Sequence, residues 1–327
     1  MADLLPTLGV IACYLVVLRT IDLNEREPWW ALLHFLTLGT LATLVLNVAV
    51  DPALLTLSVW PGAAWRAVTI GAAMALGVAM LAGFERYRGW PELNDLMDGL
   101  VYGAATGLGA GVAEALQHQL AEPSLVGARL AGPPLVSLAS LALSGLVWGL
   151  CGAAIGVGMG FALLRLRTVP GRIAALLAGL AASTGIGGLY EIAAHEAPLT
   201  GSGGLTRAWI TLLLPLGAVM AAACYAILVE RHAIARELQA EVDGGRITAR
   251  DVRMLLATGA RHAAYARDLL TGRWRHLARH VALHNRLVQI ALVRSALGRA
   301  PGRRRRDALE ASLSRLRDAV QVITRAD

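Results

Sequence analysis

The amino-acid sequence predicts an all-α protein: a polytopic membrane bundle of about seven transmembrane helices, followed by a helical cytoplasmic tail. The first supporting observation is composition, since hydrophobic residues make up 56% of the 327-residue chain and charged residues only 16%. Soluble globular proteins carry about a quarter charged residues. The shortage of charge indicates that a large part of the chain lies in lipid.

The second observation is an uneven distribution of charge. Residues 1–229 contain 10 arginines and 13 acidic residues, a net charge of −3, whereas residues 230–327 contain 20 arginines and 10 acidic residues, a net charge of +10. The sequence contains no lysine. We therefore predict two parts, a transmembrane bundle of residues 1–229 and a basic helical tail of residues 230–327.

The third observation is the length of the apolar stretches. A helix that crosses the hydrocarbon core needs about 20 mostly apolar residues. Seven stretches reach or approach this length: 4–18, 29–50, 65–84, 96–119, 134–164, 173–195 and 208–229. Glycines recur every fourth residue at Gly103, Gly107 and Gly111, and small residues let helices approach closely in lipid. The pattern predicts a closely packed bundle.

Loop arginines predict the orientation of this bundle. On the side of the tail, the loops contain Arg19, Arg26, Arg86, Arg88, Arg165, Arg167 and Arg172. The opposite loops contain one arginine each: Arg66, Arg129 and Arg207. Because cytoplasmic loops retain positive charge, we expect the N-terminus outside and the tail in the cytoplasm.

Two glutamate–histidine pairs are the main candidates for chemistry within the bundle. Glu114 and His118 lie four residues apart in one predicted span, and Glu191 and His195 have the same spacing in another. This spacing puts each pair on one helix face, near the outer end of its span. Both residue types are ligands for zinc, and a carboxylate can activate water. Alternatively, the histidines mark the water interface and each glutamate only hydrogen-bonds within the bundle.

Residues 94–114, with the sequence NDLMDGLVYGAATGLGAGVAE, resemble a motif of the PrsW family of bacterial intramembrane proteases. The shared features are the Asp-Gly and Tyr-Gly pairs, the Gly-Leu-Gly stretch and the final glutamate. The acidic, proline-containing residues 21–30 and the tail residues 235–238 and 244–248 are similar to other parts of that family. The resemblance implies a protein of the bacterial cytoplasmic membrane that acts on membrane-anchored proteins, with Glu114 in its catalytic site.

The chain departs from the family's other motifs. The family has a Glu-Glu pair followed by Lys on the preceding span, where residues 72–76 here read AAMAL. Ala110 replaces a phenylalanine, a later family histidine falls near Ser144, and the last histidine motif falls near His195. Peptide hydrolysis needs an activated water and a stabilised oxyanion. The losses therefore favour a diverged or catalytically impaired member that binds membrane-anchored partners or substrates.

Two alternatives stay open. The first is an active intramembrane metallopeptidase with Glu114 and Glu191 as catalytic residues and with Glu114, His118, Glu191 and His195 as ligands of a zinc ion. The second is a small-molecule transporter or channel. The sequence does not show the two repeating halves with broken helices that many transporters have, which disfavours the second.

The tail is predicted to be helical, with Thr248 as the N-cap of residues 249–256, further helices at 273–297 and 305–323, and a break at 298–302. Its arginine-rich residues 273–286 and 303–306 could bind anionic lipid headgroups or nucleic acid. Because the bilayer is the nearer polyanion, we expect lipid and not nucleic acid. The alternative is a helical hairpin whose solvated face is basic without a ligand.

Overall fold

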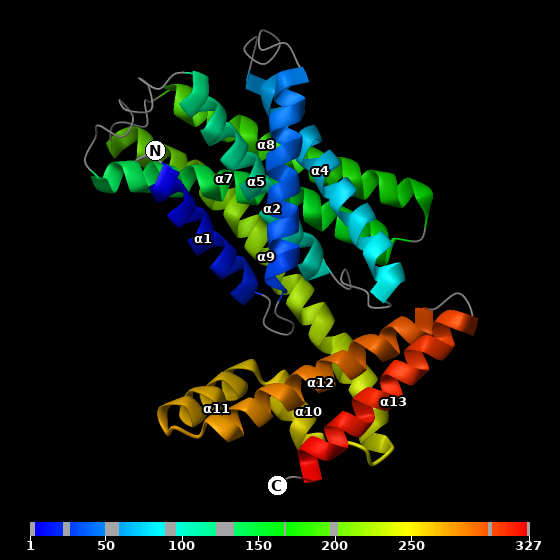
Figure 1. Cartoon of the computed structure of the whole chain (residues 1–327). Helices are drawn as coiled ribbons and strands as arrows, with labels where there is room; N and C mark the ends of the chain where they lie inside the picture. Colours follow the sequence, from blue (N-terminus) through cyan, green and yellow to red (C-terminus); the bar gives the residue numbers. More distant parts are fainter. Residues whose placement is uncertain are drawn as a thin grey trace. The chain divides into compact units, whose positions relative to one another are not determined.

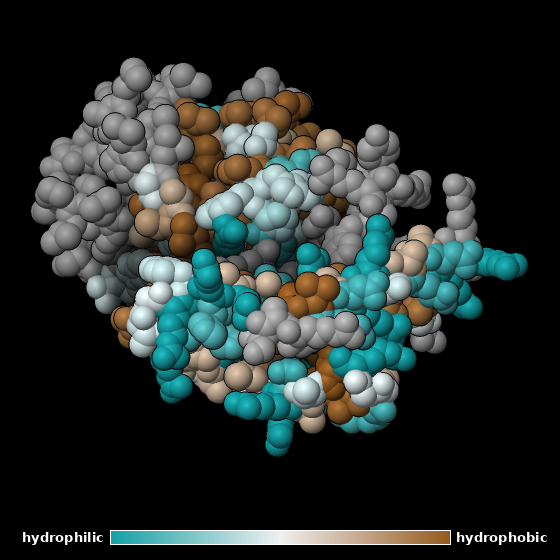
Figure 2. Space-filling view, turned by 60° about the horizontal axis from the view of Figure 1, so that its bottom comes forward, coloured by the Kyte–Doolittle hydropathy of each residue, from teal (hydrophilic) through white to brown (hydrophobic). Residues whose placement is uncertain are grey.

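The computed structural model describes residues 4–21, 27–49, 59–88, 96–121, 134–166, 168–196, 202–299 and 303–325. These residues form eleven α-helices and one short π-helix, without a strand among them (Figure 1), which confirms the all-α class. The chain divides into two compact units: unit 1 contains the described residues up to Ala226, and unit 2 those from Ile227 onwards. Apolar residues are prominent on the surface of unit 1 and hydrophilic ones on that of unit 2 (Figure 2).

Unit 1 consists of long helices. In chain order they are α1 (Leu4–Ile21), α2 (Trp29–Ala49), α4 (Val59–Arg88), α5 (Leu96–Ala121), α7 (Pro134–Gly160) with the π-helix η1 (Phe161–Arg165), α8 (Val169–Glu196) and the first part of α9 (Ser202–Asp243). Each apolar stretch of the sequence coincides with one of these helices. Five of them, α2, α4, α7, α8 and α9, contain stretches long and apolar enough to cross a membrane. This supports a membrane protein, while the count of seven spans stays a prediction.

Helix α5 lies at the centre of unit 1, packed mainly against α7 and α2 (Figure 1). All of residues 96–110 are buried, because glycines allow close approach on two sides. A Cβ atom on Gly103 or Gly152 would overlap the carbonyl oxygen of the other, and one on Gly109 would overlap the carbonyl oxygen of Leu36. The regular glycine spacing therefore serves direct backbone contact between helices.

We expect Gly152→Ala to lower the stability of unit 1 by about 1–3 kcal/mol, because the added methyl group forces α5 and α7 apart. The measurement is the fraction of protein that stays folded after heating in detergent, followed by size-exclusion chromatography. Gly185→Ala in α8 is the matched control, since a Cβ atom there meets nothing within 4 Å. Equal loss in both variants would contradict the close-contact role.

Unit 2 contains residues 227–243 of α9, α10 (Ala249–Leu256), α11 (Thr258–Leu270), α12 (Trp274–Arg299) and α13 (Arg303–Arg325). The prediction of Thr248 as an N-cap is confirmed. The Asp251 backbone N–H donates to the Thr248 hydroxyl oxygen, with 3.1 Å between nitrogen and oxygen, and the Thr248 backbone N–H donates to the Asp251 carboxylate in return. The predicted break starts two residues too early, because α12 continues through Gly298 to Arg299.

A buried carboxylate joins the segments of unit 2. Glu241 of α9 is 0% exposed, and its two oxygens accept hydrogen bonds from Arg246, Arg294 of α12 and Arg317 of α13. The Arg246 and Arg317 contacts to Oε2 both measure 3.0 Å. A buried charge is tolerated only when it is paired and hydrogen-bonded. Here three arginines from different segments supply the pairing, so Glu241 orders the packing of α9, α12 and α13.

A second buried polar contact lies between α11 and α12. The Tyr265 hydroxyl is 2.5 Å from Nδ1 of His284, which is 4% exposed. Burial, followed by the positive charges of Arg261 and His280, lowers the pKa of His284 to about 4. The imidazole is therefore neutral at neutral pH, as its burial beside two basic residues favours.

This histidine gives unit 2 a pH dependence. Because its pKa is about 4 in the fold and 6.5 in the unfolded chain, the stability it contributes is present above pH 6.5 and is lost as the pH falls towards 4. The loss is on the order of 3 kcal/mol. We expect hydrogen-exchange protection of α12 to fall over this range. The change should be much smaller in His284→Phe, and the control His276→Gln, an exposed site, should behave like wild type.

Candidate functional site

Arg66 lies between the two glutamates that the sequence singled out. It belongs to α4, Glu114 to α5 and Glu191 to α8. Its Nε atom is 3.7 Å from Oε1 of Glu114, and its Nη1 atom forms an ion pair with Oε1 of Glu191. Its guanidinium carbon is 5.7 Å from the centre of the Trp148 ring of α7, a cation–π contact. Four helices thus meet at one arginine.

The three charged side chains are partly buried. Their exposed fractions are 31% for Arg66, 28% for Glu114 and 20% for Glu191. One guanidinium faces two carboxylates, so one negative charge remains in excess. Gly111 of α5 allows this arrangement, because a Cβ atom there would overlap the Trp148 ring. The cluster is therefore a packed ion-pair network and not an open group of acids.

The prediction of Arg66 as a loop residue is wrong, whereas its place in the predicted apolar stretch 65–84 agrees with the structure. The residue lies inside α4, and its side chain points at Glu114 and Glu191. The signal was present, since Arg66 immediately follows Trp65 at the start of a predicted span that contains no other charge before Glu85. An arginine inside an apolar stretch needs a partner, and the two glutamates were the available anions.

The histidines of the predicted metal site follow the glutamates on the same helices. His118 lies in α5 and His195 in α8, each about one turn after its glutamate, but their side chains lie outside the part that the structure describes. Among the described side chains, no group of three or more His, Cys, Asp and Glu gathers as metal ligands. The guanidinium of Arg66 occupies the cationic position between Glu114 and Glu191, so these two residues as they stand do not fit a metal ion.

The position of the family's first motif is apolar in space as well as in sequence. Ala73 and Met74 of α4 are 1% and 0% exposed, and Ala110 of α5 is 1% exposed. Any replacement carboxylate must therefore come from elsewhere in the bundle.

Cys151 of α7 is also buried, and its thiol donates to the Ser183 carbonyl of α8 at 3.5 Å, which is a packing contact.

Two segments that resemble the PrsW family touch each other. The Tyr102 hydroxyl of α5 donates to Oε2 of Glu27, which precedes α2, and both side chains are buried. The Tyr102 ring also stacks on Phe35 of α2, with 4.6 Å between ring centres. No local sequence pattern pairs Glu27 with Tyr102, because they lie 75 residues apart.

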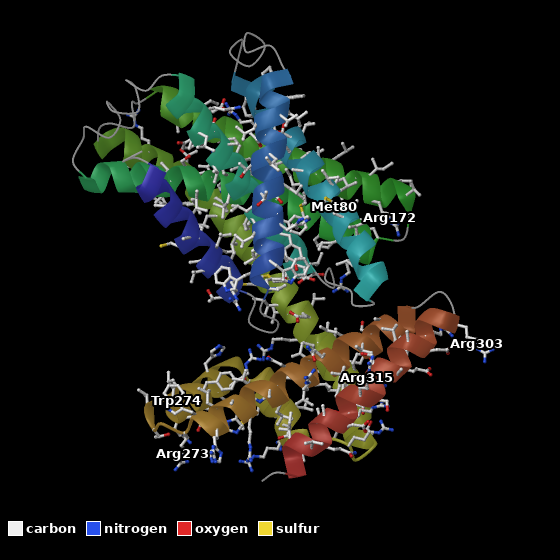
Figure 3. All side chains as sticks on the ribbon, in the orientation of Figure 1. Met80, Arg172, Arg273, Trp274, Arg303 and Arg315 are labelled. Carbon is white, nitrogen blue, oxygen red and sulfur yellow. The ribbon has the colours of Figure 1, made fainter. Side chains whose placement is uncertain are left out.

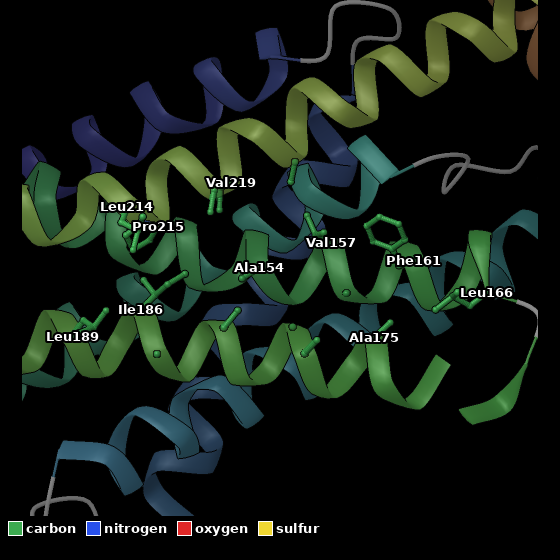
Figure 4. A pocket seen from close by; sticks show the side chains of 17 residues that line it. Ala154, Val157, Phe161, Leu166, Ala175, Ile186, Leu189, Leu214, Pro215 and Val219 are labelled. Carbon is green, nitrogen blue, oxygen red and sulfur yellow. The ribbon is translucent and has the colours of Figure 1, made fainter. Parts of the chain in front are cut away.

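A separate cavity of about 610 Å³ lies between α7, α8 and α9 (Figure 4). Alanine, glycine and larger apolar residues line it, among them Ala154, Val157, Ile186, Pro215 and Val219. Among the residues that the structure describes, no polar side chain lines it, so the described lining offers no group that could activate water. It can accept only hydrocarbon or apolar side chains.

No family model, curated protein or solved structure matches the chain. The geometry and the residue motifs are therefore the basis for a functional proposal.

The ion-pair network can be tested by charge removal. We expect Arg66→Met to destabilise unit 1 by about 1–3 kcal/mol, less than for a fully buried pair because the groups are partly exposed. Adding Glu114→Gln and Glu191→Gln to this variant should restore most of the loss, since no unpaired carboxylate remains. Thermal stability in detergent is the measurement, and Arg207→Met, at an exposed arginine of α9, is the control. A triple variant less stable than Arg66→Met would contradict the network.

Proposed function

We propose that the protein is a diverged, PrsW-like protein of the bacterial cytoplasmic membrane that binds a membrane-anchored protein partner without hydrolysing it. The observation that carries this proposal is the pairing of Arg66 with both Glu114 and Glu191. The same bilayer holds protein and partner, with the N-terminus outside and the basic tail in the cytoplasm.

The ion pairs bear directly on catalysis. A general base must reach a water molecule and take its proton. A carboxylate oxygen that already faces a guanidinium has less capacity to orient and deprotonate water. Arginine keeps its proton throughout the accessible pH range, so it stays a permanent partner. Since residues 72 and 73, which would carry the two glutamates of the family motif, are both alanine, those positions offer no carboxylate that could act as a base.

The resemblance to the family gains support from one contact. Glu27 and Tyr102 come from the two segments of unit 1 that resemble PrsW proteins, and they form a buried hydrogen bond. Two similar segments that contact each other in the fold support the resemblance more strongly than two similar segments that lie apart. This contact favours a shared bundle architecture, while the replaced motif residues favour a change of activity.

An active metallopeptidase is the second candidate, and one observation favours it. Glu114 and Glu191 approach one point, and His118 and His195 follow on the same helices. This activity would require Arg66 to leave the carboxylates. A transporter or channel is less well supported, because the cavity between α7, α8 and α9 offers a polar solute no ligands.

A cleavage assay separates the first two candidates. We expect purified protein in lipid vesicles to leave transmembrane peptides intact, and cells with and without the protein to contain the same membrane-protein N-termini. The physical reason is the occupied carboxylate pair. The comparison includes Glu114→Gln, Glu191→Gln and the control Glu310→Gln, an exposed glutamate of α13.

Cleavage that both Glu114→Gln and Glu191→Gln abolish, with Glu310→Gln unaffected, would refute the non-hydrolytic proposal. Metal analysis adds an independent measurement. If wild-type protein binds stoichiometric zinc and the double variant His118→Ala/His195→Ala does not, the metallopeptidase site is established. If wild-type protein binds no zinc after incubation with the metal, the result supports the binding role.

A further inference from the structure

The turn between α11 and α12 gathers exposed apolar side chains on the otherwise hydrophilic unit 2. The large, exposed apolar residues described in that unit are Leu228, Leu269, Leu270, Trp274 and Val322. Three of them flank this turn, with exposed fractions of 48% for Leu269, 85% for Leu270 and 63% for Trp274. Leaving such groups in water is unfavourable by roughly 25 cal/mol per Å², so their concentration at one end indicates a contact surface.

The backbone holds these side chains outward. Gly272 has a φ of +68°, a conformation that favours glycine. The amide of Thr271 donates to the Arg267 carbonyl at 2.9 Å, and that of Arg273 donates to the Asp268 carbonyl at 2.8 Å. The end of α11 is therefore closed by its own hydrogen bonds, and α12 begins at once. The exposure of Leu270 and Trp274 follows from a well-formed turn.

The charges around this turn have one sign. Arg267, Arg273 and Arg275 are exposed, and Figure 3 shows Arg273 and Trp274 together at the end of the helical pair. Asp268 is the sole acidic residue between Asp251 and Asp307. It is 7% exposed, and its carboxylate lies 2.8 Å from Nδ1 of His280. The acid is thus turned inward, and the surface presents arginine alone.

We propose that this turn, residues 267–275, inserts into the interface of an anionic phospholipid membrane. Leu269, Leu270 and Trp274 enter the boundary between headgroups and acyl chains, where tryptophan is favoured. Arg267, Arg273 and Arg275 bind the phosphate and other anionic headgroup oxygens, each raising the ratio of inserted to free turn roughly fivefold. This inference goes beyond partner binding and does not depend on it.

A membrane fits this surface better than a protein groove does. Unit 2 continues along the chain from α9, which contains a candidate membrane span. That covalent connection keeps the turn near a bilayer at high effective concentration. Long arginine side chains can reach headgroups while the adjacent leucines enter the apolar layer. The other basic run, residues 303–306, differs in this respect. The leucine nearest to it in sequence, Leu309, is only 7% exposed, so this run offers charge without an exposed leucine beside it.

Depth-sensitive spin labelling of the full-length protein tests this proposal. The native residues Cys13, Cys151 and Cys224 are replaced by alanine, and a nitroxide is attached at Thr271→Cys or, as a control, at Ser314→Cys on the exposed face of α13. The protein is placed in nanodiscs of phosphatidylcholine, with or without about a third of phosphatidylglycerol. Accessibility to oxygen and to a water-soluble nickel complex reports the depth of the label.

We expect the label at position 271 to be protected from nickel and accessible to oxygen in anionic nanodiscs, and to move towards water at high salt. Two variants should return the label to water: the double variant Leu270→Ser/Trp274→Ser and the triple variant Arg267→Gln/Arg273→Gln/Arg275→Gln. The control variant Val322→Ser should leave the label in the membrane. Because all these positions are exposed, the helices should keep their hydrogen-exchange protection. The label at position 314 should face water in every lipid.

Water exposure of position 271 in anionic nanodiscs would overturn the proposal. So would equal protection at position 314, since it would show adsorption of the whole unit. Residues 267–275 could instead be protected from water in native membrane vesicles but exposed in anionic nanodiscs that contain no other protein. That result would identify a protein as the occupant and would likewise overturn the proposal.

Discussion

The close approach of α5 to its neighbours is the constraint on which the rest of unit 1 depends. Gly103 and Gly152 bring the backbones of α5 and α7 into direct contact, and Gly109 does the same towards α2. Hydrophobic burial cannot drive helix association inside lipid, so packing of this kind must supply the attraction. The same register sets Gly111 against Trp148, and the ring of Trp148 faces the guanidinium of Arg66. Backbone contact at α5 thus fixes where the charged cluster forms.

Both units neutralise carboxylates with arginine, but the ratios differ. In unit 1 one arginine faces Glu114 and Glu191, which leaves negative charge in excess and partly exposed. In unit 2 three arginines surround the single carboxylate of Glu241, which is 0% exposed. Both oxygens of Glu241 accept hydrogen bonds, so its role is structural. In the Arg66 group, by contrast, one guanidinium is shared by two partly exposed carboxylates.

Sequence patterns predicted the helices well, because apolar length and glycine spacing report directly on packing in lipid. They predicted much less of the polar contacts. Glu27 and Tyr102 pair across 75 residues, and Glu241 pairs with Arg317 across 76, separations that no local period encodes. Arg66 lies at the edge of an apolar stretch, a place that suits both a loop charge and a partner of intramembrane acids, and the fold alone distinguishes the two. The inward direction of Asp268, on which the basic turn depends, is also a property of the fold alone.

The exclusive use of arginine gives the Arg66 cluster a fixed charge. A lysine in the same place could lose its proton in a partly desolvated site and release both carboxylates, whereas a guanidinium stays charged. Its planar form can also face two carboxylates and an aromatic ring together, as it does with Glu114, Glu191 and Trp148. Catalysis by a carboxylate requires proton exchange with water during each turnover. A carboxylate pair held by a permanent cation is therefore poorly suited to transferring protons.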